Sequence, residues 1–361
     1  MRTLLALVAA ALLLLTPRPF AARTVCDPER FGAVAHLAWS FFYRSPEEIA
    51  RGLGMMRDAG IGWVRLNWSW KDFQPEPGPF EFENFDTVAR LANEYDIELL
   101  PILITIPAWA STAPAEMIAR LGDLAPVDRY RPDDLTDWLT YVRTVVERYD
   151  GDGIEDAPGS PRLSHWEVWN EPNLALYWVP EVNAVEYAEF LAITHETIKG
   201  ADPTATVVLG GLSGSGVNNE GTGFLQQLYA AGAGAAFDVV GVHHYVHPAR
   251  GSITGLREAL EATRRVMDEN GDEEKPLWLT EIGWSDAPEA WGQPTATREE
   301  IAAWLVQVYT TPLPVEKIFW YNFRNLDVTD QVEHNFGLVE RDFTPKPAYE
   351  AYAAVGEACR G

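Results

Sequence analysis

The feature that most constrains the fold of this chain is a regular alternation of short apolar segments with amphipathic segments. The apolar segments are β-branched or aromatic runs without clean polar alternation, as expected for parallel strands covered on both faces. The strand candidates are Phe31–Ala38, Gly62–Asn67, Glu98–Ile104, Ser164–Asn170, Thr206–Gly211, Asp238–His243, Pro276–Glu281 and Glu316–Tyr321. Helical patterns follow them at Pro46–Ala59, Asn84–Tyr95, Asp134–Tyr149, Ala184–Lys199, Phe224–Ala231, Gly255–Asn270, Arg298–Tyr309 and Pro347–Ala358. Eight strand–helix pairs predict an α/β fold, a single-domain (β/α)8 TIM barrel, with an open doubly wound sheet as the alternative.

Two of the predicted helices begin with residues typical of a capping box. Ser45 precedes Glu48 by three positions, and Thr297 precedes Glu300 by the same spacing. In such a pair each side chain accepts a hydrogen bond from the other residue's backbone N–H. We expect both helices to start there.

The composition agrees with one large soluble domain. Of the 361 residues, 47% are hydrophobic and 12% are aromatic, which is ample for a large core. The formal net charge of −25 argues against partners that need a basic surface, namely nucleic acids and anionic membranes.

The first residues have the layout of a secretory signal peptide. A positive start precedes twelve apolar residues, Leu4 to Leu15, and small residues near Ala22 offer a cleavage point. We therefore expect residues 1–22 to be a signal peptide, residues 23–361 to form the catalytic barrel, and the mature chain to be secreted, extracellular or periplasmic. An uncleaved N-terminal anchor is the alternative, because Pro19 and Phe20 make an untidy cleavage site.

The chain has two cysteines, Cys26 and Cys359, near opposite ends of the mature sequence. In a closed barrel the last helix packs beside the first strand, and exported chains meet an oxidising compartment. We predict a disulfide between them; two unpaired thiols are the alternative. A metal site is not expected with so few soft ligands.

The chemistry is expected at the carboxyl ends of two strands. Trp169-Asn170-Glu171-Pro172 ends the fourth predicted strand, and Glu281 ends the seventh. Loops and strand ends on that side of a barrel build its active site, so the two carboxylates should face each other across the mouth. Cleavage of a glycosidic bond needs such a pair, one protonated and one ionised.

These motifs resemble glycoside hydrolase clan A over nearly the whole mature chain. Within the clan, Glu167-Val168-Trp169-Asn170-Glu171-Pro172-Asn173 followed by Trp178 looks most like family 39, the β-xylosidase and exopolysaccharide-hydrolase group. The cellulase-like family 5 is the nearest competitor. It carries a histidine near the end of the third strand, whereas this chain has Ile104-Thr105-Ile106-Pro107 there.

The resemblance implies a role for each matching residue. It implies Glu171 as the acid/base and Glu281 as the nucleophile of a retaining mechanism, with carboxyl oxygens about 5–5.5 Å apart. The substrate-binding residues that it implies are Asn170 on the sugar 2-hydroxyl, Arg65 and Tyr245 beside the nucleophile, His243, and Trp320 as the floor of the first sugar site. No cofactor and no metal is implied.

Several other features have a structural and a functional interpretation. Glu167 is expected to be a buried partner inside the barrel rather than a catalyst. The segment Gly210–Gly216 is expected to be a flexible loop at the mouth, since it fits neither a phosphate-binding loop nor a nucleophile elbow. The segment Pro107–Val127 is a candidate wall or lid, and Gly151–Arg162 is expected to be a solvent loop on the opposite face. Tryptophans near predicted strand ends could stack on sugars or pack in the core: Trp39, Trp68, Trp70, Trp109, Trp178 and Trp284.

The function predicted from the sequence is therefore hydrolysis of O-glycosidic bonds in a β-linked glycan or glycoside, with an oligo- or polysaccharide as the substrate. A secreted carbohydrate-binding protein without turnover and a transglycosylase with the same residues are the alternatives. The sequence does not specify the sugar, the linkage or the oligomeric state.

Overall fold

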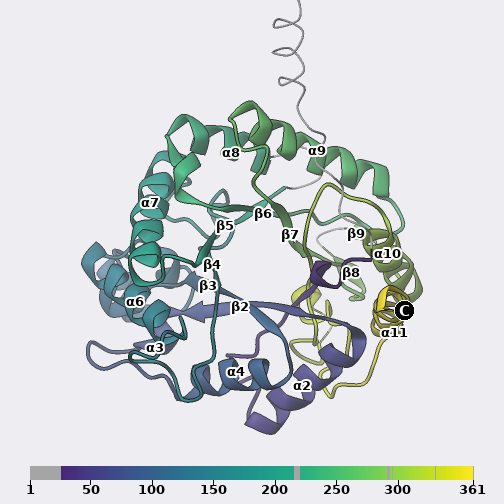
Figure 1. Cartoon of the computed structure of the whole chain (residues 1–361), viewed down its shortest axis with the longest axis horizontal. Coiled ribbons are helices and arrows are strands. Elements are labelled where there is room, and N and C mark those ends of the chain that lie inside the picture. Colours follow the sequence, from purple (N-terminus) through teal and green to yellow (C-terminus); the bar gives the residue numbers. More distant parts are fainter. Residues whose placement is uncertain (1–25, 215–219, 291–292, 295, 330, 361) are drawn as a thin grey trace, which may run out of the picture.

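The computed structural model, which describes residues 26–214, 220–290, 293–294, 296–329 and 331–360, contains a closed parallel barrel (Figure 1). Its strands are β1 (Phe31–Val34), β2 (Trp63–Ser69), β3 (Glu98–Ile104), β4 (His165–Val168), β5 (Thr206–Ser213), β6 (Val239–His243), β7 (Leu277–Ile282) and β10 (Ile318–Trp320). The barrel closes because β1 pairs with both β2 and β10. The predicted (β/α)8 fold is confirmed, and the open-sheet alternative is wrong.

Helices form a ring outside the barrel (Figure 1). They are α2 (Pro46–Ala59), α4 (Glu83–Glu94), α6 (Leu135–Arg148), α7 (Ala184–Ala201), α8 (Glu220–Ala230), α9 (Ile253–Glu269), α10 (Arg298–Thr310) and α11 (Pro347–Arg360). Each corresponds to a predicted helix with ends shifted by a few residues. In α4, for example, Val88, Leu91 and Ala92 are buried, the three- and four-residue spacing of an amphipathic helix. None of the helices described is long and apolar enough to cross a membrane.

The two predicted helix caps differ. At α10 the Thr297 hydroxyl accepts from the Glu300 N–H and the Glu300 carboxylate accepts from the Thr297 N–H, so this capping box is confirmed. At α2 the Ser45 hydroxyl accepts from the Glu48 N–H, but the Glu48 carboxylate accepts from the Arg44 N–H at 3.2 Å. The second half of that predicted box is wrong, because Glu48 reaches one residue further back.

The barrel interior is filled by side chains, one from each of seven strands. This cluster consists of Val34, Trp63, Leu100, Val208, Val239, Trp278 and Phe319. Each is at most 5% exposed, and burying side chains of this size stabilises the fold by about 1.5–3 kcal/mol each. The barrel is thus a packed core, and ligands have access only to the strand ends.

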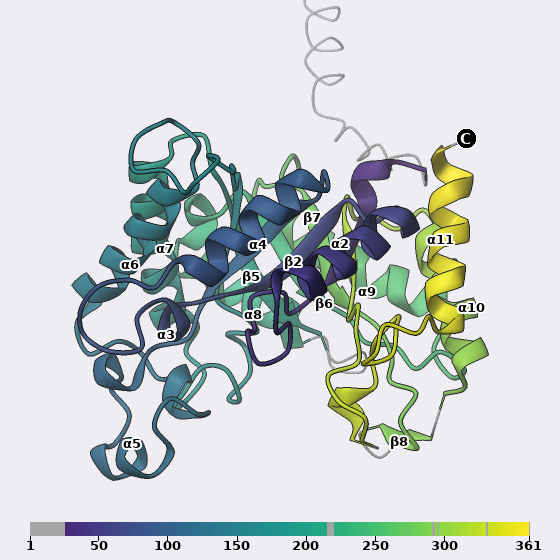
Figure 2. The ribbon, with the colours of Figure 1, turned by 90° about the horizontal axis from the view of Figure 1, so that it is seen from below.

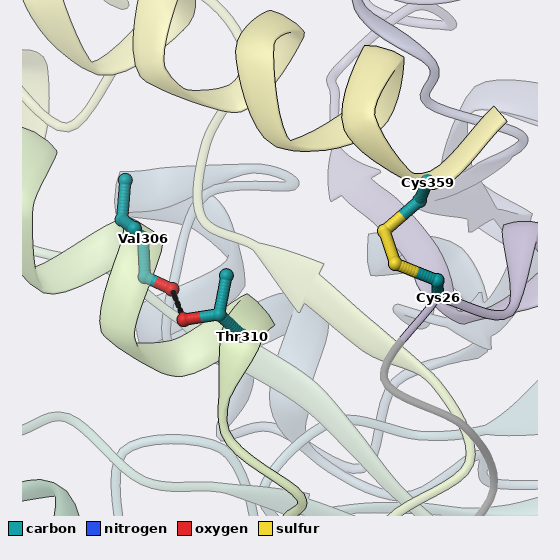
Figure 3. The surroundings of a disulfide bond; sticks show 4 residues. All are labelled: Cys26, Val306, Thr310 and Cys359. Carbon is teal, nitrogen blue, oxygen red and sulfur yellow. Dashed lines mark hydrogen bonds between the residues drawn. A yellow bond between two sulfur atoms is a disulfide. The ribbon is translucent and has the colours of Figure 1, made fainter. Parts of the chain in front are cut away.

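A disulfide joins the two ends of the described chain. Cys26 lies just before the 3-10 helix η1 (Pro28–Arg30) and Cys359 lies in the last turn of α11, with Cα atoms 4.6 Å apart (Figure 3). The predicted bond is confirmed. The predicted signal peptide, residues 1–22, lies outside the described residues.

The long segment after β3 has structure of its own. It contains η2 (Ala108–Ala110), α5 (Ala115–Leu121) and the start of η3 (Val127–Arg129). Figure 2 shows α5 projecting from one end of the barrel, while the carboxyl end of α11 lies at the other end. The Lys71 ammonium donates to the Asp128 carboxylate at 2.6 Å, and the Ala108 N–H donates to the Asp123 carboxylate at 2.5 Å. These contacts favour a wall over a lid. Residues 151–155 are exposed, as expected for a solvent loop.

Candidate active site

The two predicted catalytic carboxylates meet at the carboxyl end of the barrel. Glu281 is the penultimate residue of β7, and Glu171 follows β4 by three positions. One carboxylate oxygen of each lies within 4.8 Å of the other, and a ring nitrogen of His243 lies within the same distance of both. This upper bound is below the predicted 5–5.5 Å and below the about 6.5 Å at which an inverting arrangement begins.

Both oxygens of Glu281 receive hydrogen bonds. The Arg65 guanidinium donates to Oε1 at 2.6 Å, and the Tyr245 hydroxyl donates to Oε2 at 2.6 Å. Burial raises the pKa of Glu281, but the charges of His243 and Arg65 and the hydrogen bonds from Tyr245 and Arg65 outweigh that effect and lower it. Glu281 is therefore held as an anion.

Arg65 is held in place by Glu167 and Asn170 as well as by Glu281. It is 1% exposed, and its Nε and Nη2 donate to the two oxygens of the fully buried Glu167 at 2.6 and 2.9 Å. Its Nη2 also donates to Oδ1 of Asn170 at 2.8 Å. Burial disfavours the guanidinium charge, yet Glu167 and Glu281 raise the pKa of Arg65 above its usual value. Glu167 is thus the buried partner expected from the sequence, and it orients the group that binds Glu281.

Glu171 lies in different surroundings. One of its oxygens is 2.9 Å from Nδ1 of His243, and its backbone N–H donates to the Gly211 carbonyl. The backbone has φ of 45° at Glu171 and 71° at Trp169, the left-handed region that non-glycine residues rarely adopt. Such conformations cost about 1–3 kcal/mol each and occur where the surrounding structure holds them, often at active sites.

The glycines after β4 have a packing role. Gly210 and Gly211 are buried residues of β5, which continues to Ser213. The predicted strand through Gly211 is therefore confirmed, and the overlapping prediction of a flexible loop is wrong for residues 210–213, while residues 215 and 216 lie outside the described residues. A Cβ on Gly211 would lie 2.0 Å from Nε2 of His243 and 2.7 Å from Oγ1 of Thr280. Glycine is required there so that the His243 ring can lie against β5.

Trp320 is the one predicted site residue that does not reach the mouth. It is fully buried in the cluster between barrel and helices, so it cannot form the floor of a sugar site. Successive strand residues face opposite sides. Phe319 and Tyr321 therefore point to the inside of the barrel, and Tyr321, which precedes a cis peptide bond to Asn322, is the partly exposed aromatic residue at the mouth.

The sequence analysis missed two further residues near the carboxylates. Burial, together with the charges of Glu171 and Glu281, raises the pKa of Tyr177 far above its usual value. His36 follows β1 by two positions, and both of its ring nitrogens are buried without a hydrogen-bond partner among the described residues. Burial lowers the pKa of His36 to about 4, with Arg65 acting in the same direction and Glu281 opposing it. His36 lies within the predicted strand Phe31–Ala38, and Tyr177 follows Glu171 by six positions, so the places of both residues in the chain were usable signals.

Glu171, His243 and Glu281 also have the spacing of a metal site. The surrounding donors do not fit a cation, because the Arg65 guanidinium and the Tyr245 hydroxyl already bond the two oxygens of Glu281. A metal ion would lie beside the buried guanidinium charge.

Comparison with known sequences identifies the family. The profile described as "Glycosyl hydrolase catalytic core" matches residues 158–352, which include Glu171, His243, Tyr245 and Glu281. The chain belongs to this glycosyl hydrolase family. A second profile, described as "Beta-galactosidase", matches residues 40–209 of the same glycosyl hydrolase.

Individual relatives of this glycosyl hydrolase agree with that assignment. It is 26% identical to a β-xylosidase of Geobacillus stearothermophilus over 299 residues, which cover 75% of this chain and 55% of the relative. A family 39 glycoside hydrolase from Bacteroides cellulosilyticus WH2 has a similar structure, with a TM-score of 0.65 and 24% identity over 92% of this chain and 64% of the other. A GH5_18 protein from Streptomyces cattleya gives a TM-score of 0.67 at 17% identity, covering 92% of this chain and 80% of the other.

The resemblance to clan A, with family 39 as the group it looks most like, is confirmed. The chain spans only about half of the length of that β-xylosidase.

Proposed function

We propose that this protein is a retaining β-glycoside hydrolase in which Glu281 is the nucleophile and Glu171 is the acid/base. The observation that carries the proposal is the unequal treatment of two neighbouring carboxylates. Both oxygens of Glu281 accept strong hydrogen bonds from Arg65 and Tyr245 that favour the anion. The Glu171 carboxylate, within 4.8 Å, has its hydrogen bond with His243, whose Nδ1 is 2.9 Å from Glu171 and 3.6 Å from Glu281. A glycosidase needs this division between an ionised and a protonated carboxyl group.

The two half-reactions follow from this arrangement. Glu281 attacks the anomeric carbon and forms a glycosyl ester, while Glu171 gives its proton to the glycosidic oxygen as that bond breaks. The ester removes the negative charge of Glu281. Glu171, now a carboxylate, takes a proton from water as the water oxygen attacks the anomeric carbon and Glu281 leaves.

Neighbouring residues support these steps. Arg65 and Tyr245 hold Glu281 in place before attack. The Asn170 Oδ1 accepts a hydrogen bond from Arg65, and in the proposed mechanism its amide nitrogen donates to the sugar 2-hydroxyl. Tyr321 takes the position at the sugar floor that the sequence analysis assigned to Trp320.

A panel of 4-nitrophenyl β-glycosides and β-linked polysaccharides tests the activity and identifies the sugar. Proton NMR of the first-formed product tests the mechanism. We expect the β-anomer first from a β-substrate, and an initial α-anomer would contradict the assignment of Glu281 as nucleophile.

Two other functions would use the same cleft. A carbohydrate-binding protein would show saturable binding without product, which the pairing of Arg65 and Tyr245 with Glu281 disfavours, because a binder needs no ionised nucleophile. A transglycosylase would transfer the sugar to an added acceptor instead of water, and product analysis with and without the acceptor separates the two.

We also propose that residues 1–22 direct export and that the mature chain begins at residue 23. Amino-terminal sequencing of protein from the culture medium or periplasm tests this. Protein retained in the membrane with residues 1–22 attached would support the uncleaved anchor.

A further inference from the structure

A series of aromatic ring contacts connects the surroundings of Glu281 with the surface of the loop after β1. Tyr245, whose hydroxyl bonds Glu281, contacts Tyr321 edge-on with ring centroids 6.2 Å apart, and Tyr321 contacts His36 in the same way at 6.2 Å. His36 is stacked on Trp39 at 3.9 Å, and Trp39 is stacked on Phe41 at 5.4 Å. We call Tyr321, His36, Trp39 and Phe41 the aromatic row.

The outer end of the aromatic row is open to solvent. Phe41 is 71% exposed and Trp39 is partly exposed. A single exposed hydrophobic residue is common on protein surfaces. Phe41 differs from an isolated exposed residue because its ring continues the series of ring contacts that begins beside Glu281.

A groove of about 750 Å³ lies beside the outer end of the row, between the β1–α2 loop and the start of α4. Its lining combines the two aromatic rings with charged and amide groups: Trp39, Phe41, Lys71, Asp72, Glu83 and Asn84. Sugars present apolar CH faces and hydroxyl edges, so aromatic rings flanked by polar side chains suit them. A dry protein–protein contact would instead remove these charged groups from water, which costs free energy.

The strand order indicates which part of a substrate would lie there. Around the barrel the order is β1-β10-β7-β6-β5-β4-β3-β2, so β1 is next to β10 and opposite β5, and β4 is opposite β10. In the proposed mechanism the leaving group stays beside Glu171, after β4, and the attacked sugar lies over Glu281. The aromatic row starts at Tyr321, which contacts Tyr245 on the Glu281 side, and runs away from β4 and β5. It therefore lies on the side of the attacked sugar.

We infer that the aromatic row and the groove at its end bind further sugars of a β-linked chain on the non-leaving side of the cleaved bond, so that the enzyme cuts within oligo- or polysaccharides. This inference rests on the proposed function. It names the substrate class, a chain of several sugars rather than a terminal monosaccharide.

The test compares nitrophenol release from 4-nitrophenyl β-xyloside and β-xylotrioside, and from the corresponding β-glucoside and β-cellotrioside. Release of nitrophenol from a trioside places all three sugars on the non-leaving side. For the sugar that the enzyme accepts, we expect kcat/KM to be at least about tenfold higher for the trioside. Phe41→Ala should lower the trioside value about three- to tenfold, the range for losing one aromatic contact, and leave the monoside value within about twofold.

Ile154→Ala is the matched control, since Ile154 is 61% exposed and lies in the loop Gly151–Arg162. It should change neither rate. Equal rates for monoside and trioside in the wild type, or an equal loss for both in Phe41→Ala, would overturn the inference and leave the proposed function intact. Loss of a dimer in sedimentation of Phe41→Ala with unchanged kinetics would assign the groove to a second copy of the chain. No release from any aryl β-glycoside by the wild type would count against the proposed function itself.

Discussion

Glu281 shows how a few contacts decide the chemistry of one residue. Burial alone would raise its pKa and keep it protonated, as it does for an isolated carboxyl group in an apolar site. The Arg65 guanidinium, held from behind by Glu167, and the Tyr245 hydroxyl reverse that effect. Glu171 has no guanidinium contact among the described residues. In the proposed mechanism, the difference between nucleophile and acid therefore depends on which carboxylate the buried Arg65 guanidinium contacts.

Tyr245→Phe tests that balance. Removing the hydroxyl removes a hydrogen bond to the ionised form, so the pKa of Glu281 should rise toward its ordinary value. Because Glu281 must be ionised to attack, the acidic limb of the pH profile of kcat/KM should move to higher pH. Dinitrophenyl glycosides suit this measurement, since their leaving group needs little help from Glu171. Tyr349→Phe, which loses a hydrogen bond to the Met55 carbonyl on the outer helices, should leave the limb in place. If the acidic limb of the pH profile stayed in place in Tyr245→Phe, the hydrogen bond from Tyr245 would not explain the lowered pKa of Glu281.

Glu171→Ala and Glu281→Ala should fail in different ways. Without Glu171, a glycoside with an acidic phenol should still form the glycosyl-enzyme and then stall, because no base activates water. The expected trace is a burst of phenol followed by a slow phase. Added azide should accelerate the slow phase and give a β-glycosyl azide.

Glu281→Ala should lose turnover of every substrate, by several kcal/mol of transition-state stabilisation. Azide should rescue it, if at all, to an α-glycosyl azide. Cleavage of natural glycans by Glu171→Ala at the wild-type rate would refute the assignment of the acid.

At the scale of single elements, β5 and β10 show how strand geometry positions groups that belong to other strands. β5 carries glycines where the His243 ring from β6 must lie, and its Gly211 carbonyl accepts from the Glu171 N–H. β10 alternates its side chains, so Trp320 packs outward and Tyr321 reaches the mouth. The active site is thus assembled by backbone spacing as much as by catalytic side chains.

Gly211→Ala tests the role of β5. The new methyl group would meet His243 and Thr280 at less than 3 Å, so the imidazole must move. We expect a destabilisation of about 1–3 kcal/mol, as for other overpacked sites, and a large loss of kcat. Gly223→Ala in α8 is the matched control, because no atom of the described residues outside the helix's own backbone lies within 4 Å of its Cβ position. It should be neutral or stabilise the protein by up to about 1 kcal/mol. Urea unfolding and steady-state kinetics of both variants provide the comparison.

At the scale of the whole molecule, the disulfide and the active site lie at opposite ends of the barrel. Figure 2 shows the carboxyl end of α11 on one side and α5, in the segment that leaves β3, on the other. The bond closes a loop with a sequence separation of 333 residues, so its main effect is to restrict the unfolded chain. Removing the disulfide should therefore lower the stability of the fold and have little effect on catalysis.

The double variant Cys26→Ser/Cys359→Ser should unfold at lower temperature. The chain-entropy argument gives about 5–6 kcal/mol for a loop of this length, an upper figure because long loops deliver less than the argument predicts. Calorimetry of the variant, and of the wild type with and without reductant, measures the loss. At 25 °C kcat/KM should stay within about twofold of the wild type, and a parallel loss of activity in the folded variant would show that the bond also shapes the cleft.

The sequence by itself determined the architecture and the two carboxylates. Apolar runs without polar alternation, each followed by an amphipathic helix, are compatible with few folds other than a closed parallel barrel. In that fold a glutamate at a strand end points to the mouth, so Glu171 and Glu281 could be placed before any coordinates existed. The same local information located the helix starts and, through barrel closure, the pairing of Cys26 with Cys359.

Only the tertiary structure decided the contacts between distant segments. Whether Trp320 or Tyr321 faces the mouth depends on the alternation phase of β10, and a shift of one residue exchanges the two faces. The predicted strand ends at Gly211, whereas β5 continues to Ser213, because that residue pairs with the distant His243 of β6. Tyr177 and His36 lie near the two carboxylates because the segments after β4 and β1 pack there. Such loops have no periodic sequence pattern that predicts where they pack. Their position near the site is therefore known only from the folded barrel.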